Sequence, residues 1–525
     1  MEGANDKKAG GAEPVLTTRL KARLDGLCWK CVSVEADQAG HLSPRHLLLC
    51  ATPRPYSAIF RRLISSQAEK KIMRPFGGWR SSKRKMRPLI LSGLIVACAP
   101  APLRGQSRDE FENSPINYSA TEPSDIITAL EAKMASGAFV ITGSEKEKVA
   151  ALLHKLQVPV ESLLLVFSNT SFQRGRIRPE HPRVLYFSDN CYVGWVPGGL
   201  VEVIAIDPML GPVFYSFDSN RRDGTAPRFV RDSDCLRCHG GAFVRDIPAV
   251  FARSVFPDDR GEPLLRFGSQ IVDDHTPFTE RWGGWYVSGR HGQTTHRGNI
   301  LATDKGGQLV FNTAKGANVT DLAPFFGTDR YLATGSDIVA LLIFEHQMGT
   351  QNTLTHAAFS CRRMLAYQAG LQHDFKQPVT TEPSYDSVKS VFESETKAVV
   401  DALLFKDAAE LPTVSGDQSF QRVFLSRAKR SADGGSLRDL HLAGRLFRNR
   451  CSYLIYSEMF LSLPEPLKRR VYDRLARVLK ADDPDSHYEY LDAGERARIL
   501  AILHDTHPEL RSRWSQAAPV APAGP

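Results

Sequence analysis

Long apolar runs are missing from this sequence, and so is any excess of charge beyond its N-terminal part. The chain has 525 residues, and no apolar stretch in it approaches the roughly 20 residues that a membrane-spanning helix needs. The first 85 residues hold 17 basic and 7 acidic residues, a net charge of +10, which out of a total of +9 leaves −1 for the rest. Since a nucleic-acid-binding surface concentrates positive charge, we expect no nucleic acid partner and no transmembrane helix in the mature protein.

Cysteine is scarce as well, with nine in the whole chain, and no spacing among them demands a disulfide framework. Buried free thiols are the simplest interpretation of Cys191, Cys361 and Cys451. A C-x-x-C pair at Cys28 and Cys31 is followed by valine, and a lone pair of this kind is weak evidence for metal or redox chemistry.

A second C-x-x-C pair, Cys235 and Cys238, is followed directly by His239. C-x-x-C-H is the attachment pattern of c-type haem, in which two thiols add to the vinyl groups and the histidine binds the iron. A zinc half-site or a redox pair would also use two cysteines, but no second Cys/His pair at ligand spacing and no βαβ context accompany this one. The pattern occurs once, so we expect one covalent haem c.

A distal iron ligand could come from a stretch rich in histidine and tryptophan. His275, His291 and His296 fall within 22 residues, and His346 and Met348 lie in a helix predicted further on. Histidine and methionine are both common axial ligands. For each residue the alternative is an ordinary hydrogen-bonded or buried side chain. Arg222, Arg228 and Arg231, just before the motif, could pair with haem propionates.

The N-terminal part predicts export. Residues 1–85 form a basic leader without sustained periodicity, which we expect to be absent from the mature protein, with translation starting at Met86. Residues 86–105 contain about ten apolar residues after a basic cluster, as in a signal peptide. The sequence before Cys98 resembles a lipobox, which predicts a lipid anchor there, while Ala99–Ala101 offers ordinary cleavage instead. We therefore expect a periplasmic or otherwise extracytoplasmic protein, where c-type haem is attached.

Hydrophobic periodicity predicts an α+β fold: an antiparallel β-rich front half that carries the motif, and an all-α C-terminal half. We expect a haem-binding domain over 106–335, a helical domain over 336–515 and a loose tail over 516–525. Short strands separated by turns occupy 163–217. Helices are expected at 124–134, 144–156, 338–371, 384–404, 437–460, 465–480 and 494–505, with a Gly/Ser-rich loop at about 415–436.

Three stretches carry a resemblance to a known family: Asp232–Gly240, Ile247–Phe256 and Glu280–Asn299. Together they resemble a family of exported bacterial mono-haem proteins with a cytochrome c domain, and the similarity runs from about 115 to 515. The resemblance implies covalent haem on Cys235 and Cys238, with His239 as axial ligand. It supplies no reaction.

The first expected function is extracytoplasmic electron transfer through this haem to a redox partner protein. Roughly 400 residues around one haem exceed the ~100 of a small domain. This excess supports an alternative, a haem enzyme or sensor with an open sixth iron position for peroxide, a diatomic gas or a small organic substrate. A third alternative is an extracytoplasmic binding module without haem, which predicts a Cys235–Cys238 disulfide.

Overall fold

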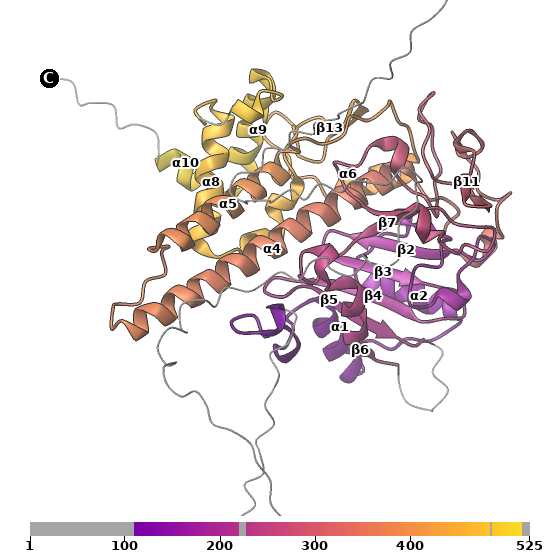
Figure 1. Cartoon of the computed structure of the whole chain (residues 1–525), viewed down its shortest axis with the longest axis horizontal. Coiled ribbons are helices and arrows are strands. Elements are labelled where there is room, and N and C mark those ends of the chain that lie inside the picture. Colours follow the sequence, from indigo (N-terminus) through magenta and orange to yellow (C-terminus); the bar gives the residue numbers. More distant parts are fainter. Residues whose placement is uncertain (1–109, 220–226, 484–485, 517–525) are drawn as a thin grey trace, which may run out of the picture. The chain divides into compact units, whose positions relative to one another are not determined.

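The computed structural model describes residues 110–219, 227–483 and 486–516. The expected leader, the signal peptide with Cys98, the Cys28–Cys31 pair, Arg222 and residues 517–525 of the expected tail lie outside these ranges. The described residues belong to one unit, which is a mixed α/β fold with an antiparallel sheet first and helices toward the C-terminus (Figure 1).

The centre of the front half is a seven-stranded antiparallel sheet in the order β6-β5-β4-β3-β2-β1-β9. The five consecutive strands predicted from short apolar runs are confirmed as β1 to β5, and each pairs antiparallel with the next along the chain. The strands are β1 (Leu164–Val166), β2 (Arg183–Ser188), β3 (Cys191–Trp195), β4 (Val201–Asp207), β5 (Gly211–Phe217), β6 (Phe229–Arg231) and β9 (Trp285–Tyr286).

Two helices cover one face of this sheet, α1 (Ile126–Ala135) and α2 (Glu145–Lys155). Asp125 caps α1 and accepts a 2.7 Å hydrogen bond from Tyr215 on β5. Ser144 and Glu147 form a capping box at the start of α2, which satisfies backbone N–H groups that a helix start leaves free. Both predicted helices are thus confirmed, and α1 contacts β4.

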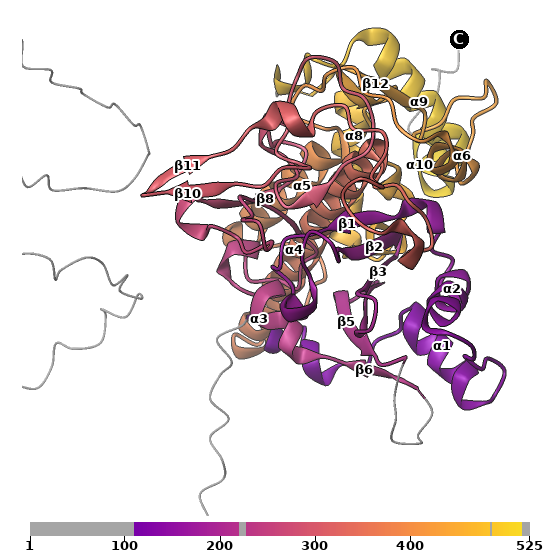
Figure 2. The same ribbon diagram turned by 90° about the vertical axis from the view of Figure 1, so that its right-hand side faces the viewer.

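The other face of the sheet is only half covered. Side chains that point to this face alternate along each strand with the buried side chains of the opposite face, as the two-residue period of a strand requires. Figure 2 shows α3 (Leu236–His239) on the far side of β5 from α1 and α2. The half-buried residues of this face are Arg183, Leu185, Glu202, Ile204 and Ser216.

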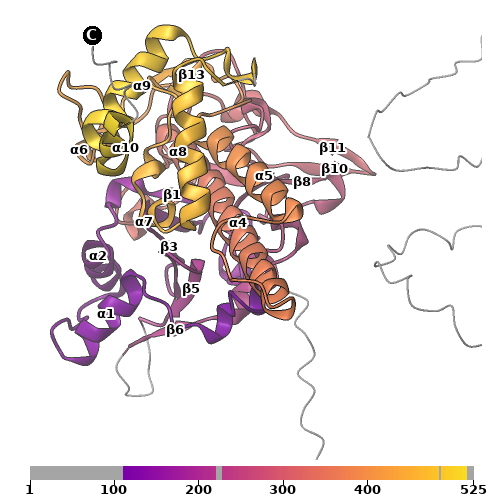
Figure 3. The ribbon, with the colours of Figure 1, turned by 90° about the vertical axis from the view of Figure 1, so that its left-hand side faces the viewer.

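The longest helix, α4 (Ile338–Asp374), joins the sheet to the helical part. Asp337 caps it by accepting from the Ala340 N–H at 3.0 Å. Gln351 accepts a hydrogen bond from the Tyr192 hydroxyl of β3 at 2.5 Å. On its other side α4 packs against α5 (Asp386–Leu403), which in turn contacts α8 (Glu465–Leu479), as Figures 1 and 3 show.

The C-terminal half is not all helical, which corrects the sequence-based expectation. In place of the helix predicted at 437–460 there is a hairpin of β12 (Leu440–Ala443) and β13 (Arg445–Phe447). Leu442 and Gly444 have φ of +61° and +74°, values a right-handed helix excludes. The backbone of Gly444 exchanges two hydrogen bonds with Leu411. This long-range pairing, which sequence periodicity does not reveal, decides the local structure.

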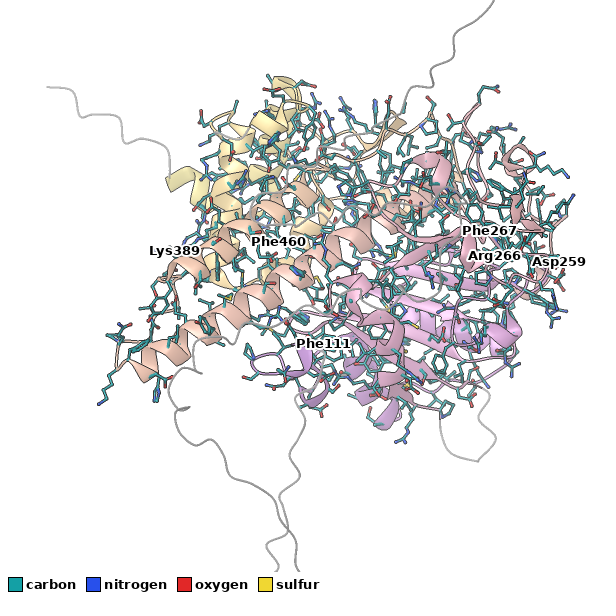
Figure 4. All side chains as sticks on the ribbon, in the orientation of Figure 1. Phe111, Asp259, Arg266, Phe267, Lys389 and Phe460 are labelled. Carbon is teal, nitrogen blue, oxygen red and sulfur yellow. The ribbon has the colours of Figure 1, made fainter. Side chains whose placement is uncertain are left out.

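A second correction concerns the loop predicted at about 415–436, where α6 (Gln418–Ser426) forms. Asp417 caps it, and Phe420 and Phe424, one turn apart, are buried. The helices predicted at 338–371, 384–404, 465–480 and 494–505 are confirmed as α4, α5, α8 and α9 (Ala493–Thr506). Phe460, labelled in Figure 4, is fully buried among these helices. The remaining elements are β7 (Ala252–Val255), β8 (Ser269–Val272), β10 (Thr303–Lys305), β11 (Gln308–Val310), α7 (Glu458–Leu461) and α10 (Pro508–Gln516).

Within the described ranges, no helix combines the length and the apolar character that crossing a bilayer requires.

Candidate functional site

The C-x-x-C-H motif forms a short helical turn on the half-covered side of the sheet. Asp232 begins the turn by accepting from the Asp234 N–H at 3.0 Å. Cys235 is half-buried, Cys238 is exposed, and both are free thiols. Because residues three and four apart share one side of a helix, Cys235, Cys238 and His239 can face one common ligand. A Cβ at Gly240 would press on the Leu236 carbonyl and on the ring of Phe111, labelled in Figure 4.

The His239 ring is held in a defined tautomer. Its Nδ1–H donates to the Ala249 carbonyl at 2.8 Å, and the Ala249 N–H donates to the His239 carbonyl at 2.9 Å. Burial lowers the pKa of His239 to about 4, although the bond to Ala249 opposes this shift. The ring is therefore neutral at pH 7, and its Nε2 has no hydrogen-bond partner in the described ranges. A neutral imidazole with one nitrogen fixed and the other free is the form that binds a metal.

Helix α4 fixes the segment that holds this histidine. The side-chain amide of Asn352 donates to the Val250 carbonyl at 2.6 Å and accepts from the Val250 N–H at 3.0 Å. Val250 follows Ala249 directly, so α4 positions the carbonyl that orients His239. The rings of Phe214 and Phe251 lie 4.9 and 4.4 Å from the imidazole.

The thiol of Cys235 is protonated rather than ionised. Burial raises its pKa to about 12, with further raising from Asp232 and Glu202 and an opposing effect of Arg183. A catalytic redox cysteine has a lowered pKa, and a zinc site binds thiolates. The raised pKa of Cys235 therefore disfavours a redox cysteine, whereas a bound zinc ion would itself deprotonate the thiol. Both cysteines of the motif are free thiols.

Beside the motif, the sheet presents an ion pair and an apolar surface. Arg183 on β2 and Glu202 on β4 are 2.5 Å apart, and Gly194 between them has no side chain, because a Cβ there would collide with the guanidinium. Buried Arg183 Nε has no hydrogen-bond partner in the described structure. The partly buried apolar side chains around the motif are Leu185, Ile204, Leu236 and Phe251.

These residues fit a c-type haem: two free thiols, a neutral histidine with a free Nε2, a half-open apolar surface and an arginine nitrogen without a partner. Sequence reasoning missed Arg183 and Asn352. The alternation along β2 could have placed Arg183 on the open face, but no local pattern links Asn352 to residue 250. Arg231 is used elsewhere, since its guanidinium donates to the carbonyls of Tyr118 and Thr121.

Two of the candidate distal ligands pair with one another. The rings of His291 and His296 are 4.6 Å apart, and both residues are buried. His291 donates from Nδ1 to the Thr294 carbonyl and accepts at Nε2 from the Asn318 N–H. His296 accepts at Nδ1 from the Gly298 N–H, and burial lowers its pKa to about 3.

The other three candidates also have neighbours of their own. His346 Nδ1 is 2.7 Å from Asp274 Oδ2, and its Nε2 is 2.8 Å from Ser452 Oγ. His275 donates from Nε2 to the Lys406 carbonyl at 3.2 Å. Met348 is buried in α4, one turn before Asn352. Asn352 itself bonds to Val250, the residue after the Ala249 carbonyl that accepts from His239 Nδ1.

No group of three or more His, Cys, Asp or Glu side chains arranged to hold a metal ion by themselves occurs in the described part of the chain. No family model, curated protein or solved structure matches the chain.

Proposed function

We propose that this protein carries one covalent haem c and transfers single electrons in an extracytoplasmic compartment. The observation that carries the proposal is the hydrogen bond from His239 Nδ1 to the Ala249 carbonyl. It leaves Nε2 as the free lone pair next to two unpaired thiols. The resemblance of the 115–515 region to exported mono-haem proteins implies the same covalent haem, although it supplies no reaction.

Each residue of the site has a role in this proposal. A covalently bound haem would supply a one-electron couple at its iron. Cys235 and Cys238 would hold the group on the protein, and His239 would offer its Nε2 to the iron. Asn352 and Ala249 keep the imidazole from rotating, which fixes ligand orientation from outside the first coordination shell. Arg183, whose charge Glu202 balances, keeps one guanidinium N–H near the site without a partner among the described residues.

A second candidate function is a haem enzyme or sensor with an open sixth position. The hydrogen bonds of the candidate histidines favour it: both nitrogens of His291 and His346, and Nδ1 of His296, already have protein partners. The spin state of the ferric protein separates the two functions. A low-spin, six-coordinate spectrum supports electron transfer, and a high-spin, five-coordinate spectrum supports the second candidate.

The test of haem attachment is a pyridine haemochrome spectrum of residues 106–525, exported to a periplasm with c-type maturation. We expect a c-type band, and we expect Cys235→Ala to lose or shift it because one thioether cannot form. Cys451→Ala is the matched control, since Cys451 is a free, fully buried thiol remote in sequence. A colourless wild-type protein, or a Cys235→Ala spectrum identical to wild type, contradicts the proposal.

A further inference from the structure

A cavity of about 500 Å³ lies where the β12–β13 hairpin meets the loop after α5. This volume is in the range of small-molecule sites, ~300–1,000 Å³. Its walls combine apolar side chains, Phe405, Leu411, Leu446 and Phe447 among them, with charged ones. None of these residues belongs to the C-x-x-C-H site.

Two arginines of the cavity share a single carboxylate. Arg445 Nη1 and Arg450 Nη2 lie 3.1 and 2.7 Å from Glu495 Oε2, and Glu495 is fully buried. Two guanidinium groups against one carboxylate leave one positive charge without a matching negative charge. The arginine side chains are 27% and 19% exposed, so solvent or a ligand can reach them.

One of the two arginines also keeps an unused donor. Buried Arg445 Nε has no hydrogen-bond partner in the described structure. A buried donor without a partner is costly, and an anion in the cavity could supply one. A guanidinium binds a carboxylate with particularly favourable geometry.

The other charged groups of the cavity are mostly matched within the protein. Arg281 pairs with buried Glu345 at 2.7 Å and Asp407 with Lys406, while Asp274 contacts His346, a pair whose charges match only when the imidazole is protonated. Glu410 is exposed at the surface, where solvent weakens its field. Beside Glu495, by contrast, two guanidinium groups face one buried carboxylate, so a ligand there would meet positive charge.

The backbone around the cavity adopts unfavourable conformations. Phe405, Asp407 and Leu442 have φ of +57°, +57° and +61°, which non-glycine residues adopt uncommonly and bulky ones rarely. The ring of Phe405 stacks on His346 at 4.1 Å with an interplanar angle of 19°. Conformations of this kind persist where the surrounding structure enforces them, and they cluster at binding sites.

We infer that this cavity binds a small monocarboxylate with an apolar, ring-sized body, its carboxylate on Arg445 and Arg450 and its body against Phe405 and Phe447. This would be a second ligand site, and it does not depend on whether haem is bound.

The test is isothermal titration of residues 106–525 with phenylacetate and with its neutral isostere 2-phenylacetamide. We expect phenylacetate to bind at least tenfold more tightly than the amide. Arg445→Gln should weaken phenylacetate binding at least tenfold, because Glu495 then neutralises the remaining Arg450. Arg469→Gln, which removes a surface cation paired with Glu382, is the matched control and should leave binding unchanged.

Ala443→Trp provides a second variant should Arg445→Gln fail to fold, because it fills the cavity without removing a charge. It should abolish binding while the far-UV circular dichroism stays that of wild type. Equal affinity for acid and amide, no heat at millimolar ligand, or unchanged binding in the folded variants would overturn the inference.

Discussion

The immediate surroundings of single residues decide the chemistry of the C-x-x-C-H site. The same two cysteines could form a redox pair, bind zinc or hold a haem. The sequence pattern favours the haem without excluding the other two. The high pKa of the Cys235 thiol, which follows from burial with Asp232 and Glu202 reinforcing it, disfavours the redox pair. The bond from His239 Nδ1 to the Ala249 carbonyl leaves Nε2 free, as the proposed haem requires.

Removing the Asn352 amide should destabilise the protein. In Asn352→Ala the Val250 N–H and carbonyl lose their partners, and unsatisfied buried groups cost ~1–3 kcal/mol each. For the two groups together we expect the free energy of unfolding, measured by urea titration, to fall by about 2–6 kcal/mol. The adjacent Thr353→Ala, which removes only a bond to the Gly349 carbonyl, should change it by less than ~0.5 kcal/mol. An equal loss of unfolding free energy in the two variants would contradict a specific role of Asn352 in holding Val250.

Asp337 should give the protein a recognisable pH dependence. Burial raises its pKa to about 7 from 3.8, against the lowering effect of its backbone hydrogen bonds. The folded state therefore retains a proton that the unfolded chain releases, and this contribution to stability is present below pH 3.8 and lost as pH rises through 7.

Asp337→Asn should remove that dependence, since asparagine imitates the protonated carboxyl. We expect the free energy of unfolding of wild type, relative to the variant, to decrease between pH 4 and 7. Each unit of pKa shift corresponds to about 1.4 kcal/mol. Urea titrations of both proteins at several pH values measure the difference. Parallel pH profiles would mean that Asp337 is ionised throughout.

At the scale of elements, two glycines show how backbone conformation separates a helix from a turn. Gly444 has φ of +74° in the β12–β13 turn, while Gly370 is an interior residue of α4, and a Cβ at either position would meet nothing within 4 Å. The two sites therefore differ in backbone conformation and not in available space.

Alanine at these two positions should act in opposite directions. Gly444→Ala should lower the free energy of unfolding by ~1–2 kcal/mol, the cost of a left-handed conformation for a residue with a Cβ. Gly370→Ala should raise it by ~0.5–1 kcal/mol, because alanine is the better helix former. Thermal unfolding followed by circular dichroism at 222 nm compares the variants. The same sign for both would contradict the conformations assigned here.

On the scale of the whole molecule, α4 ties the sheet to the C-terminal helices. Its residues bond to β3 through Gln351 and to the His239 segment through Asn352. The buried apolar side chains of the two predicted domains form one continuous cluster. Residues 106–335 and 336–515 thus share their core.

Unfolding should accordingly be a single transition. We expect tryptophan fluorescence and far-UV circular dichroism of residues 106–525 to give coincident urea curves, since neither half has a separate core. A fragment of residues 106–335 should show no cooperative transition, because it lacks the helix that covers its sheet. Two separated transitions in the longer protein would instead indicate independent domains.

The sequence alone determined what local patterns encode. It located the C-x-x-C-H motif, the five-strand meander and most of the helices, because chemistry at fixed spacing and hydrophobic period are properties of short segments. The tertiary structure alone decided the rest. The hairpin at 440–447 depends on pairing with Leu411, the tautomer of His239 depends on Ala249 and Asn352, and the cavity beside Glu495 is lined by segments far apart in the chain. Contacts between distant residues leave no periodic trace, so they become visible only when the chain is folded.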